Sequence, residues 1–194
     1  VAAGDNVLVH AGASGVGEAA IQVAGLLGAR AFASAGSAEK LAFCRELGAA
    51  QVFNYRETPA FSELVKSWGG ADAVLDPVGA AYLAENLQAL NPDGRLVNIG
   101  LMGGLKAELD FGRLLMKRIS LIGSTLRPQP PAAKARLAAA LRERILPGIL
   151  DGRLRTVVDC SFPWTQVRDA HRYVEENRNL GKVVLTMFST QAAG

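Results

Sequence analysis

Three glycines close to the start of the chain constrain its fold more than any other feature. Residues 10–17 read His-Ala-Gly-Ala-Ser-Gly-Val-Gly. Residues 6–10 form an apolar run typical of a buried strand, and residues 16–27 carry apolar side chains at helical spacing. Glycines between such elements allow a tight turn, a close approach to a pyrophosphate and close packing of helix on sheet. An ordinary tight turn is the alternative, but this context favours a dinucleotide-binding turn.

The helix after this turn would point unpaired N–H groups and the positive end of its dipole at a bound phosphate. We therefore expect the dinucleotide pyrophosphate to contact the turn at four residues, which are Ser14, Gly15, Val16 and Gly17.

Strand-like and helix-like segments alternate along the next hundred residues. This alternation predicts a parallel, doubly wound α/β sheet of the Rossmann type with right-handed crossovers. Residues 91–94, Asn-Pro-Asp-Gly, predict a turn in which glycine supplies a positive φ. The expected strands are residues 6–10, 31–35, 51–53, 72–76, 95–99 and 119–123, and the expected helices are residues 16–27, 38–47, 61–67 and 82–90.

The character of the chain changes after Arg127, where three prolines fall within residues 128–131. We expect residues 1–127 to form the dinucleotide-binding domain and residues 128–194 to form a separate C-terminal segment. That segment has a long helix over residues 132–150, a helix over residues 165–176, and two short strands, which is too little for a core of its own. It needs the first domain or an upstream segment, and the abrupt start at Val1 suggests an excised fragment.

Composition narrows the class of protein. The chain has 194 residues, a formal net charge of +3 with scattered charges, and 6% aromatic residues, which disfavours nucleic-acid binding. There is no apolar run of membrane-spanning length and no signal-peptide pattern, so the expected compartment is the cytoplasm and no membrane partner is expected. Two cysteines and two histidines at unrelated positions cannot build a structural Cys₄ zinc site, and we expect no metal.

The end of the second expected strand indicates which dinucleotide binds. An NAD site presents an acidic residue there to the ribose hydroxyls. This chain instead has Gly36 and Ser37, with Lys40 one helical turn later. A small donor and a cation suit a 2′-phosphate, so NADP(H) is favoured. Glu39 is the counter-argument, although acids are common in a first helical turn, and Lys40 as a solvated helix residue is the alternative.

Further motifs occur in order along essentially the whole chain. The set resembles the zinc-free quinone oxidoreductases of the medium-chain dehydrogenase/reductase superfamily, the zeta-crystallin-like group. The motifs are the turn at 11–17, Ala-Gly-Ser at 35–37 with Lys40, Leu-Gly-Ala at 47–49, Asn-Tyr at 54–55, Leu-Asp-Pro-Val-Gly at 75–79, Gly-Arg at 94–95, Gly-Leu-Met-Gly-Gly at 100–104 and Asn-Leu-Gly-Lys at 179–182.

The resemblance implies an architecture in three parts. Members of the group have an N-terminal GroES-like substrate domain, a central Rossmann domain, and a C-terminal segment that returns to the first domain. This chain would hold the second and third parts and lack most of the first.

The resemblance also implies further coenzyme contacts. Tyr55 would lie with Lys40 near the adenosine phosphate. Val78 and the loop of Gly100, Leu101, Met102 and Gly103 follow strand ends, where an open α/β sheet binds its ligand. Leu101, Met102 and Leu126 fit plain core packing equally well. The remaining implied contacts are Thr125, Leu126 and Arg127, against the nicotinamide, and Asn179.

No residue stands out as a catalytic acid, base or nucleophile. His10 is expected to be a packing residue, Cys44 buried and inert, and Asp76 a polar neighbour of the cofactor or a turn acid rather than a general base. The group transfers a hydride directly from NADPH to a quinone or an α,β-unsaturated carbonyl, and positioning supplies most of the catalysis. The alternatives are an enoyl reductase of a lipid or polyketide pathway, and a non-catalytic NADP(H)-binding protein of the same fold. A zinc-dependent alcohol dehydrogenase is disfavoured.

The last expected strand predicts how the chain assembles. Residues 119–124, Ile-Ser-Leu-Ile-Gly-Ser, are apolar and uncharged, and the proline-rich segment follows directly. A strand of this kind at a sheet edge is a template for pairing with another chain. We expect a homodimer through residues 119–124, as in the related family. The alternative is that Lys117 and Arg118 guard the edge and keep the chain monomeric.

Overall fold

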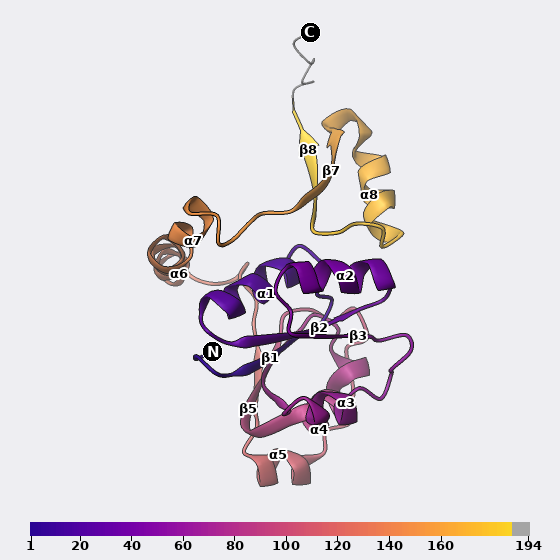
Figure 1. Cartoon of the computed structure of the whole chain (residues 1–194), viewed down its shortest axis with the longest axis vertical. Helices are drawn as coiled ribbons and strands as arrows, with labels where there is room; N and C mark the ends of the chain where they lie inside the picture. The colour runs from indigo at the N-terminus through magenta and orange to yellow at the C-terminus, as the bar shows by residue number, and fades with distance from the viewer. Residues whose placement is uncertain (188–194) are drawn as a thin grey trace.

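The computed structural model describes residues 1–187, and a six-stranded parallel sheet is its centre (Figure 1). The strand order is β3-β2-β1-β4-β5-β6, and every pairing is parallel. The expected doubly wound Rossmann fold is therefore confirmed. The strands are β1 (Asn6–Val9), β2 (Arg30–Ala35), β3 (Gln51–Asn54), β4 (Ala71–Asp76), β5 (Leu90–Asn98) and β6 (Ser120–Gly123).

Helices cover both faces of this sheet (Figure 1). One face carries α1 (Gly17–Leu26) and α2 (Ala38–Glu46), and the other carries α3 (Ser62–Ser67), α4 (Leu83–Ala89) and α5 (Phe111–Lys117), with a short 3₁₀ turn η1 (Ala80–Tyr82) before α4. Side chains alternate along β1: Val7 and Val9 pack in the core under α1 and α2, and Leu8 packs in the core on the opposite face. Because both faces are covered, β1 reads as a continuous apolar run rather than an alternating one.

The residues after the sheet form a smaller C-terminal lobe, which lies above the α1 and α2 layer in Figure 1. It contains α6 (Pro131–Arg144), α7 (Leu146–Leu150), β7 (Val158–Pro163), η2 (Trp164–Gln166), α8 (Val167–Glu175) and β8 (Lys182–Thr186), with β7 and β8 paired in parallel. The assignment of residues 128–194 to a substrate domain stays a prediction. Across residues 1–187, no helix combines the length and the apolar character that crossing a membrane would need.

The lobe is attached to the sheet domain through the glycine-rich turn. The Gly181 N–H donates to the Ala13 carbonyl at 2.8 Å, beside a bridge between Ser14 and Gly181. Glu18, buried in the first turn of α1, accepts from the Val157 N–H at 3.2 Å. Burial raises the pKa of this carboxyl above its ordinary value. The C-terminal lobe is therefore fixed to the start of α1.

Two local expectations are wrong. The helix expected over residues 132–150 is two helices, with a break at Ile145, because Pro147 has no N–H to donate and its ring clashes with the carbonyl four residues before it. In the segment 91–94, which lies within β5, the positive φ of 64° falls on Asp93 and not on Gly94. A Cβ on Gly94 would lie 2.8 Å from the Asn91 carbonyl oxygen, so this glycine is needed for space.

Candidate functional site

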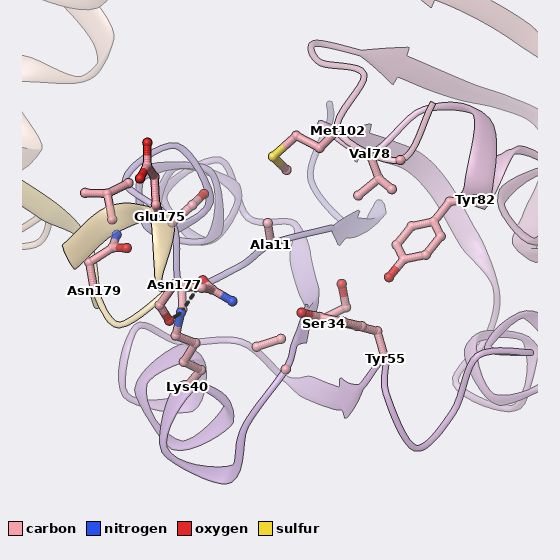
Figure 2. A pocket seen from close by; sticks show the side chains of 16 residues that line it. Ala11, Ser34, Lys40, Tyr55, Val78, Tyr82, Met102, Glu175, Asn177 and Asn179 are labelled. Carbon is pink, nitrogen blue, oxygen red and sulfur yellow. Dashed lines mark hydrogen bonds between the residues drawn. The ribbon is translucent and has the colours of Figure 1, made fainter. Parts of the chain in front are cut away.

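A cleft of about 520 Å³ opens where the carboxyl ends of the central strands face the C-terminal lobe (Figure 2). Half of its lining residues belong to the set expected from the sequence, namely Ser14, Gly36, Lys40, Tyr55, Val78, Met102, Gly103 and Asn179. The other half were not expected, namely Ala11, Ala13, Ser34, Ala35, Tyr82, Val174, Glu175 and Asn177. The position is the one at which open α/β sheets bind ligands.

The glycine-rich turn forms the floor of the cleft next to α1. The left-handed residue of the turn is Ala11, with φ of 52°, so the sharp bend does not use a glycine as expected. The glycines are needed for space instead. A Cβ on Gly17 would clash with the Ala11 carbonyl oxygen and lie 2.7 Å from the Gly12 Cα. The Ser14 hydroxyl accepts from the Gly17 N–H at 3.0 Å, which fixes the turn against the first residue of the helix.

The end of β2 has the composition expected of a 2′-phosphate site. Gly36 lies directly beneath Tyr55, and a Cβ there would be 2.6 Å from the tyrosine hydroxyl oxygen. The Ser37 hydroxyl is the N-cap of α2 and accepts from the Lys40 N–H at 3.3 Å. The Lys40 ammonium reaches the C-terminal lobe, where it donates to Asn177. Burial is the main cause that lowers the pKa of Lys40, and the nearby Arg56 guanidinium lowers it further.

The opposite wall of the cleft is formed by the loops after β4 and β5. Val78 and Met102 project toward the cleft in Figure 2, and Met102 is 74% exposed. The Gly103 N–H donates to the Val78 carbonyl at 2.7 Å, and the Met102 N–H donates to the Pro77 carbonyl at 3.2 Å. These bonds join the two loops into one wall that is largely apolar.

Asp76 holds the loop after β4 in place. It is fully buried, and its carboxylate accepts from the N–H groups of Val78 and Gly79 at 2.6 and 3.1 Å. It also accepts from the Asn86 and Asn98 side-chain amides at 3.1 and 3.0 Å. Both oxygens are thus engaged within the protein, which agrees with the expected turn acid and leaves no role as a base.

His10 continues this buried network beneath the cleft. Its Nε2 lies 2.7 Å from Asn86 Oδ1 and its Nδ1 lies 2.9 Å from the Ser34 hydroxyl. Because the Asn86 amide nitrogen donates to Asp76, Asn86 Oδ1 is an acceptor, and the His10 proton lies on Nε2. Burial lowers the pKa of His10 and keeps the ring neutral. His10 is a packing residue, as expected, with a fixed tautomer.

The two cysteines lie apart. Cys44 is buried under the glycine-rich turn, and burial raises the pKa of its thiol to about 11. The expected burial of Cys44 is confirmed. Cys160 lies in β7. Within residues 1–187 there is no group of three or more His, Cys, Asp or Glu side chains that could hold a metal ion.

Nine of the expected contact residues do not line the cleft in this structure. Residues 125–127 are fully on the surface beyond β6, and the others lie in or beside the turns described above. Their contact with a coenzyme stays a prediction. The nine are Gly15, Val16, Gly17, Ser37, Gly100, Leu101, Thr125, Leu126 and Arg127.

Sequence reasoning missed most of the wall that the C-terminal lobe contributes. Val174 and Glu175 end α8, and Asn177 lies two residues beyond it, just before the Asn-Leu-Gly-Lys motif at 179–182. No spacing rule relates this helix end to the start of α2, but the nearness of the expected contact Asn179 in sequence was a usable signal. Ser34 and Tyr82 are also close to expected residues, since Ser34 precedes Gly36 by two residues and Tyr82 follows the Val-Gly motif. Their places near the end of strand β2 and in the turn after strand β4 were a usable signal.

A family model described as "Zinc-binding dehydrogenase" matches residues 15–142. The chain belongs to this family. Within it, the similarities below confirm the quinone oxidoreductase group of the medium-chain dehydrogenase/reductase superfamily. The match begins inside the glycine-rich turn and includes strands β2 to β6 of the sheet, but not β1.

Two curated relatives are similar over nearly the whole chain. "Quinone oxidoreductase-like protein 2" of Bos taurus is 34% identical over 95% of this chain and 53% of its own length. "Quinone oxidoreductase" of Homo sapiens is 30% identical over 96% of this chain and 56% of its own length. This chain therefore spans about half the length of the curated relatives it matches.

Solved structures with the same fold come from both coenzyme classes. A quinone oxidoreductase from Thermus thermophilus, also solved in complex with NADPH, is 36% identical with a TM-score of 0.84, covering 96% of this chain and 59% of its own. A structure described as an NAD-dependent alcohol dehydrogenase is 37% identical with a TM-score of 0.83, covering 97% of this chain and 52% of its own. Overall similarity thus does not discriminate between NADPH and NADH, so the choice of coenzyme is argued from the residues of the cleft.

Proposed function

We propose that this chain binds NADP(H) in the cleft and is the coenzyme-binding part of a reductase that transfers a hydride to a quinone or an α,β-unsaturated carbonyl. The observation that carries the proposal is the set of residues found at and near the end of β2. Gly36, Tyr55 and Lys40 lie together in the cleft, and no acid follows the strand where an NAD site would present one. The complex of the Thermus thermophilus relative with NADPH supports this coenzyme.

The residues present fit a dinucleotide. The Lys182 side chain lies over Gly15, with its Nζ 2.6 Å from the place a Cβ would occupy, so a cation lies next to the glycine-rich turn. The N–H groups at the start of α1 also favour an anion. A cation and a phenol at the other end of the cleft suit a 2′-phosphate through charge-assisted hydrogen bonds. When bound, the reduced coenzyme supplies the hydride.

This chain would position the nicotinamide ring and exclude water rather than transfer protons. Val78 and Met102 offer an apolar wall, and the hydrogen bonds of Asp76 keep the backbone of that wall fixed. Neither Asp76 nor His10 has a free polar atom with which to act on a substrate. Rate enhancement would come from alignment of the reacting carbons. We further propose that the reaction needs no zinc ion.

A second candidate is reduction of an enoyl thioester. A highly reducing polyketide synthase of Cordyceps militaris is 30% identical over 97% of this chain, and the solved JamJ enoyl reductase has a TM-score of 0.79. Both substrate classes offer an electron-poor carbon to the same hydride, so the cleft residues do not choose between them. A non-catalytic NADP(H)-binding protein would use the same cleft without turnover.

The proposal is tested by binding and then by turnover. Nicotinamide fluorescence titrations with NADPH and NADH should give tighter binding of NADPH, and equal or tighter binding of NADH would contradict the proposed coenzyme. NADPH oxidation is then followed with a benzoquinone, an enone and an enoyl thioester. A rate with the thioester alone would favour the second candidate, and binding without turnover of any acceptor would favour a non-catalytic protein.

A homodimer through β6 is a further proposal. The strand is at the edge of the sheet, and Leu121 and Ile122 are 40% and 41% exposed. Unpaired backbone groups on such an edge can pair with a second copy in an isologous contact. Lys117 and Arg118, the two residues that could instead keep the edge free, are already bound within the chain. The Lys117 ammonium donates to the Leu90 carbonyl at 2.6 Å, and Arg118 pairs with Asp93.

A further inference from the structure

We propose that Asn177 of the C-terminal lobe is a positioning residue for coenzyme selection, because it holds the Lys40 ammonium at the place where a 2′-phosphate would bind. This rests on the proposed NADP(H) site and deepens it. The Lys40 ammonium donates to the main-chain carbonyl oxygen of Asn177 at 2.7 Å and to its side-chain Oδ1 at 2.6 Å (Figure 2). Both residues line the cleft although they are 137 positions apart.

The backbone at Asn177 is shaped for this contact. Asn177 follows α8 in the left-handed conformation, with φ of 54°, and its N–H donates to the Val174 carbonyl at 2.9 Å. Asparagine tolerates this conformation better than most residues with a side chain. In this conformation the main-chain and side-chain oxygens reach the same ammonium, so one residue provides two acceptors to Lys40.

The two Asn177 acceptors fix the Lys40 ammonium in place and leave part of its hydrogen-bonding capacity for an anion. An ammonium has three N–H donors, so one remains for a ligand in the cleft. A free lysine loses rotamer entropy when it is fixed, and a side chain that is already held loses less of it on binding. The Asn177 oxygens are uncharged, so they fix the ammonium without neutralising its charge. An aspartate here would neutralise it.

The surroundings of Lys40 are consistent with an anion as the missing partner. No salt bridge in the part of the chain that the structure describes involves Lys40. The nearby Arg56 guanidinium adds a second positive charge and lowers the pKa of Lys40, while Glu39 and Asp159 act in the opposite direction. Arg56 lies over the Tyr55 ring, 5.9 Å from its centre. Lys40, Tyr55 and Asn177 all line the same cleft.

The first test isolates the 2′-phosphate by titrating the chain with 2′,5′-ADP and with 5′-AMP. Asn177→Gly keeps the left-handed backbone and the main-chain acceptor but removes Oδ1. We expect the preference for 2′,5′-ADP to fall roughly three- to tenfold, the range of one hydrogen bond. In a Lys40→Ala background the same substitution should change the preference by less than about twofold, because Asn177 acts through Lys40. Equal losses in both backgrounds, or no loss in either, would overturn the proposal.

The second test is Asn177→Asp, which keeps the shape and can still accept from Lys40. Its carboxylate would neutralise the ammonium and repel a 2′-phosphate, so the preference for 2′,5′-ADP over 5′-AMP should fall at least about tenfold. A wild-type preference in this variant would mean that Asn177 only ties the lobe to α2, which contradicts the inference. Thermal unfolding of each variant shows whether the lobe remains folded.

The results also separate this inference from the proposed function. If the unmodified chain binds neither NADPH nor NADH, both the function and the inference are overturned. If it prefers NADPH and the Asn177 variants keep that preference, the function stands and only the positioning role is lost.

Discussion

Tyr55 lies directly on Gly36, with its hydroxyl oxygen 2.6 Å and its Cζ 2.8 Å from the place a Cβ would occupy. The φ of Gly36 is outside the left-handed region, so an alanine could adopt the same backbone. The missing side chain is therefore a requirement of space alone. It lets the phenol of Tyr55, from the segment after β3, lie across the end of β2 in the cleft.

Gly36→Ala should displace Tyr55 and weaken NADPH binding. The contact that we propose Tyr55 makes is a hydrogen bond to a charged phosphate, and its loss would cost about 1.5–3 kcal/mol, so we expect roughly a tenfold or larger increase in the Kd for NADPH. The Kd for NADH should change less, because it has no 2′-phosphate. Fluorescence titration with both coenzymes measures this.

Gly25→Ala is the matched control. Gly25 lies within α1 with nothing inside 4 Å of its Cβ position. The substitution should leave both Kd values unchanged and raise the free energy of unfolding by about 0.5–1 kcal/mol, because alanine favours a helix interior. If Gly36→Ala resembled this control, Tyr55 would have no part in binding.

Lys40→Ala tests the cation directly. We expect it to weaken NADPH binding by about 1.5–3 kcal/mol and to spare NADH. Lys40 is partly exposed and its ammonium contacts Asn177, so a small loss of stability from the lost tie to the C-terminal lobe is also expected. Calorimetric titration with each coenzyme gives the comparison, and an equal loss for NADPH and NADH would refute a role for Lys40 at the 2′-phosphate.

His10 should make the chain sensitive to mild acid. Its folded pKa is lowered by burial from the ordinary value near 6.5, so the unfolded chain takes up a proton first as the pH falls. The unfolded state is then stabilised, and the free energy of unfolding should decrease as the pH is lowered below about 6.5, by at most about 1.4 kcal/mol per pH unit. Urea unfolding at a series of pH values from roughly 5 to 8 measures the slope.

The His10→Gln variant shows whether this slope belongs to His10. A glutamine can still donate to Asn86, but it cannot take up a proton. The variant should be less stable at neutral pH and should show a weaker decrease of stability in acid. Identical pH slopes for the variant and the unmodified chain would assign the effect to other groups.

Leu121→Lys should shift the proposed homodimer toward monomer. A lysine on the edge strand β6 places two like charges near the two-fold axis and disfavours pairing with a second strand. Sedimentation velocity over a range of concentrations measures the shift. Leu150→Lys, at a leucine that is 79% exposed in α7, is a control with the same change of charge. An unmodified chain that remains monomeric at high micromolar concentration would refute the proposal.

Local sequence patterns were enough to predict the sheet and the position of the glycine-rich turn. A strand, a glycine turn and a helix are neighbours in sequence, and a continuous apolar run and a hydrophobic period of 3.6 residues are readable without coordinates. The same holds for Gly36 and Lys40, because a strand end and the next helix start always lie at one edge of a parallel sheet. The sequence alone therefore determined the fold class and one end of the cleft.

Only the tertiary structure revealed how the C-terminal lobe completes the cleft. The contact between Lys40 and Asn177 depends on where α8 ends relative to α2, and hydrogen bonds require oxygen and nitrogen within about 3 Å. No periodicity carries that precision over 137 residues. The buried chain from His10 through Asn86 to Asp76 is of the same kind, since the ends of β1 and β4 must meet the middle of α4 before its bonds can form. Sequence patterns specify which faces are buried, and the packing of those faces decides which polar atoms meet.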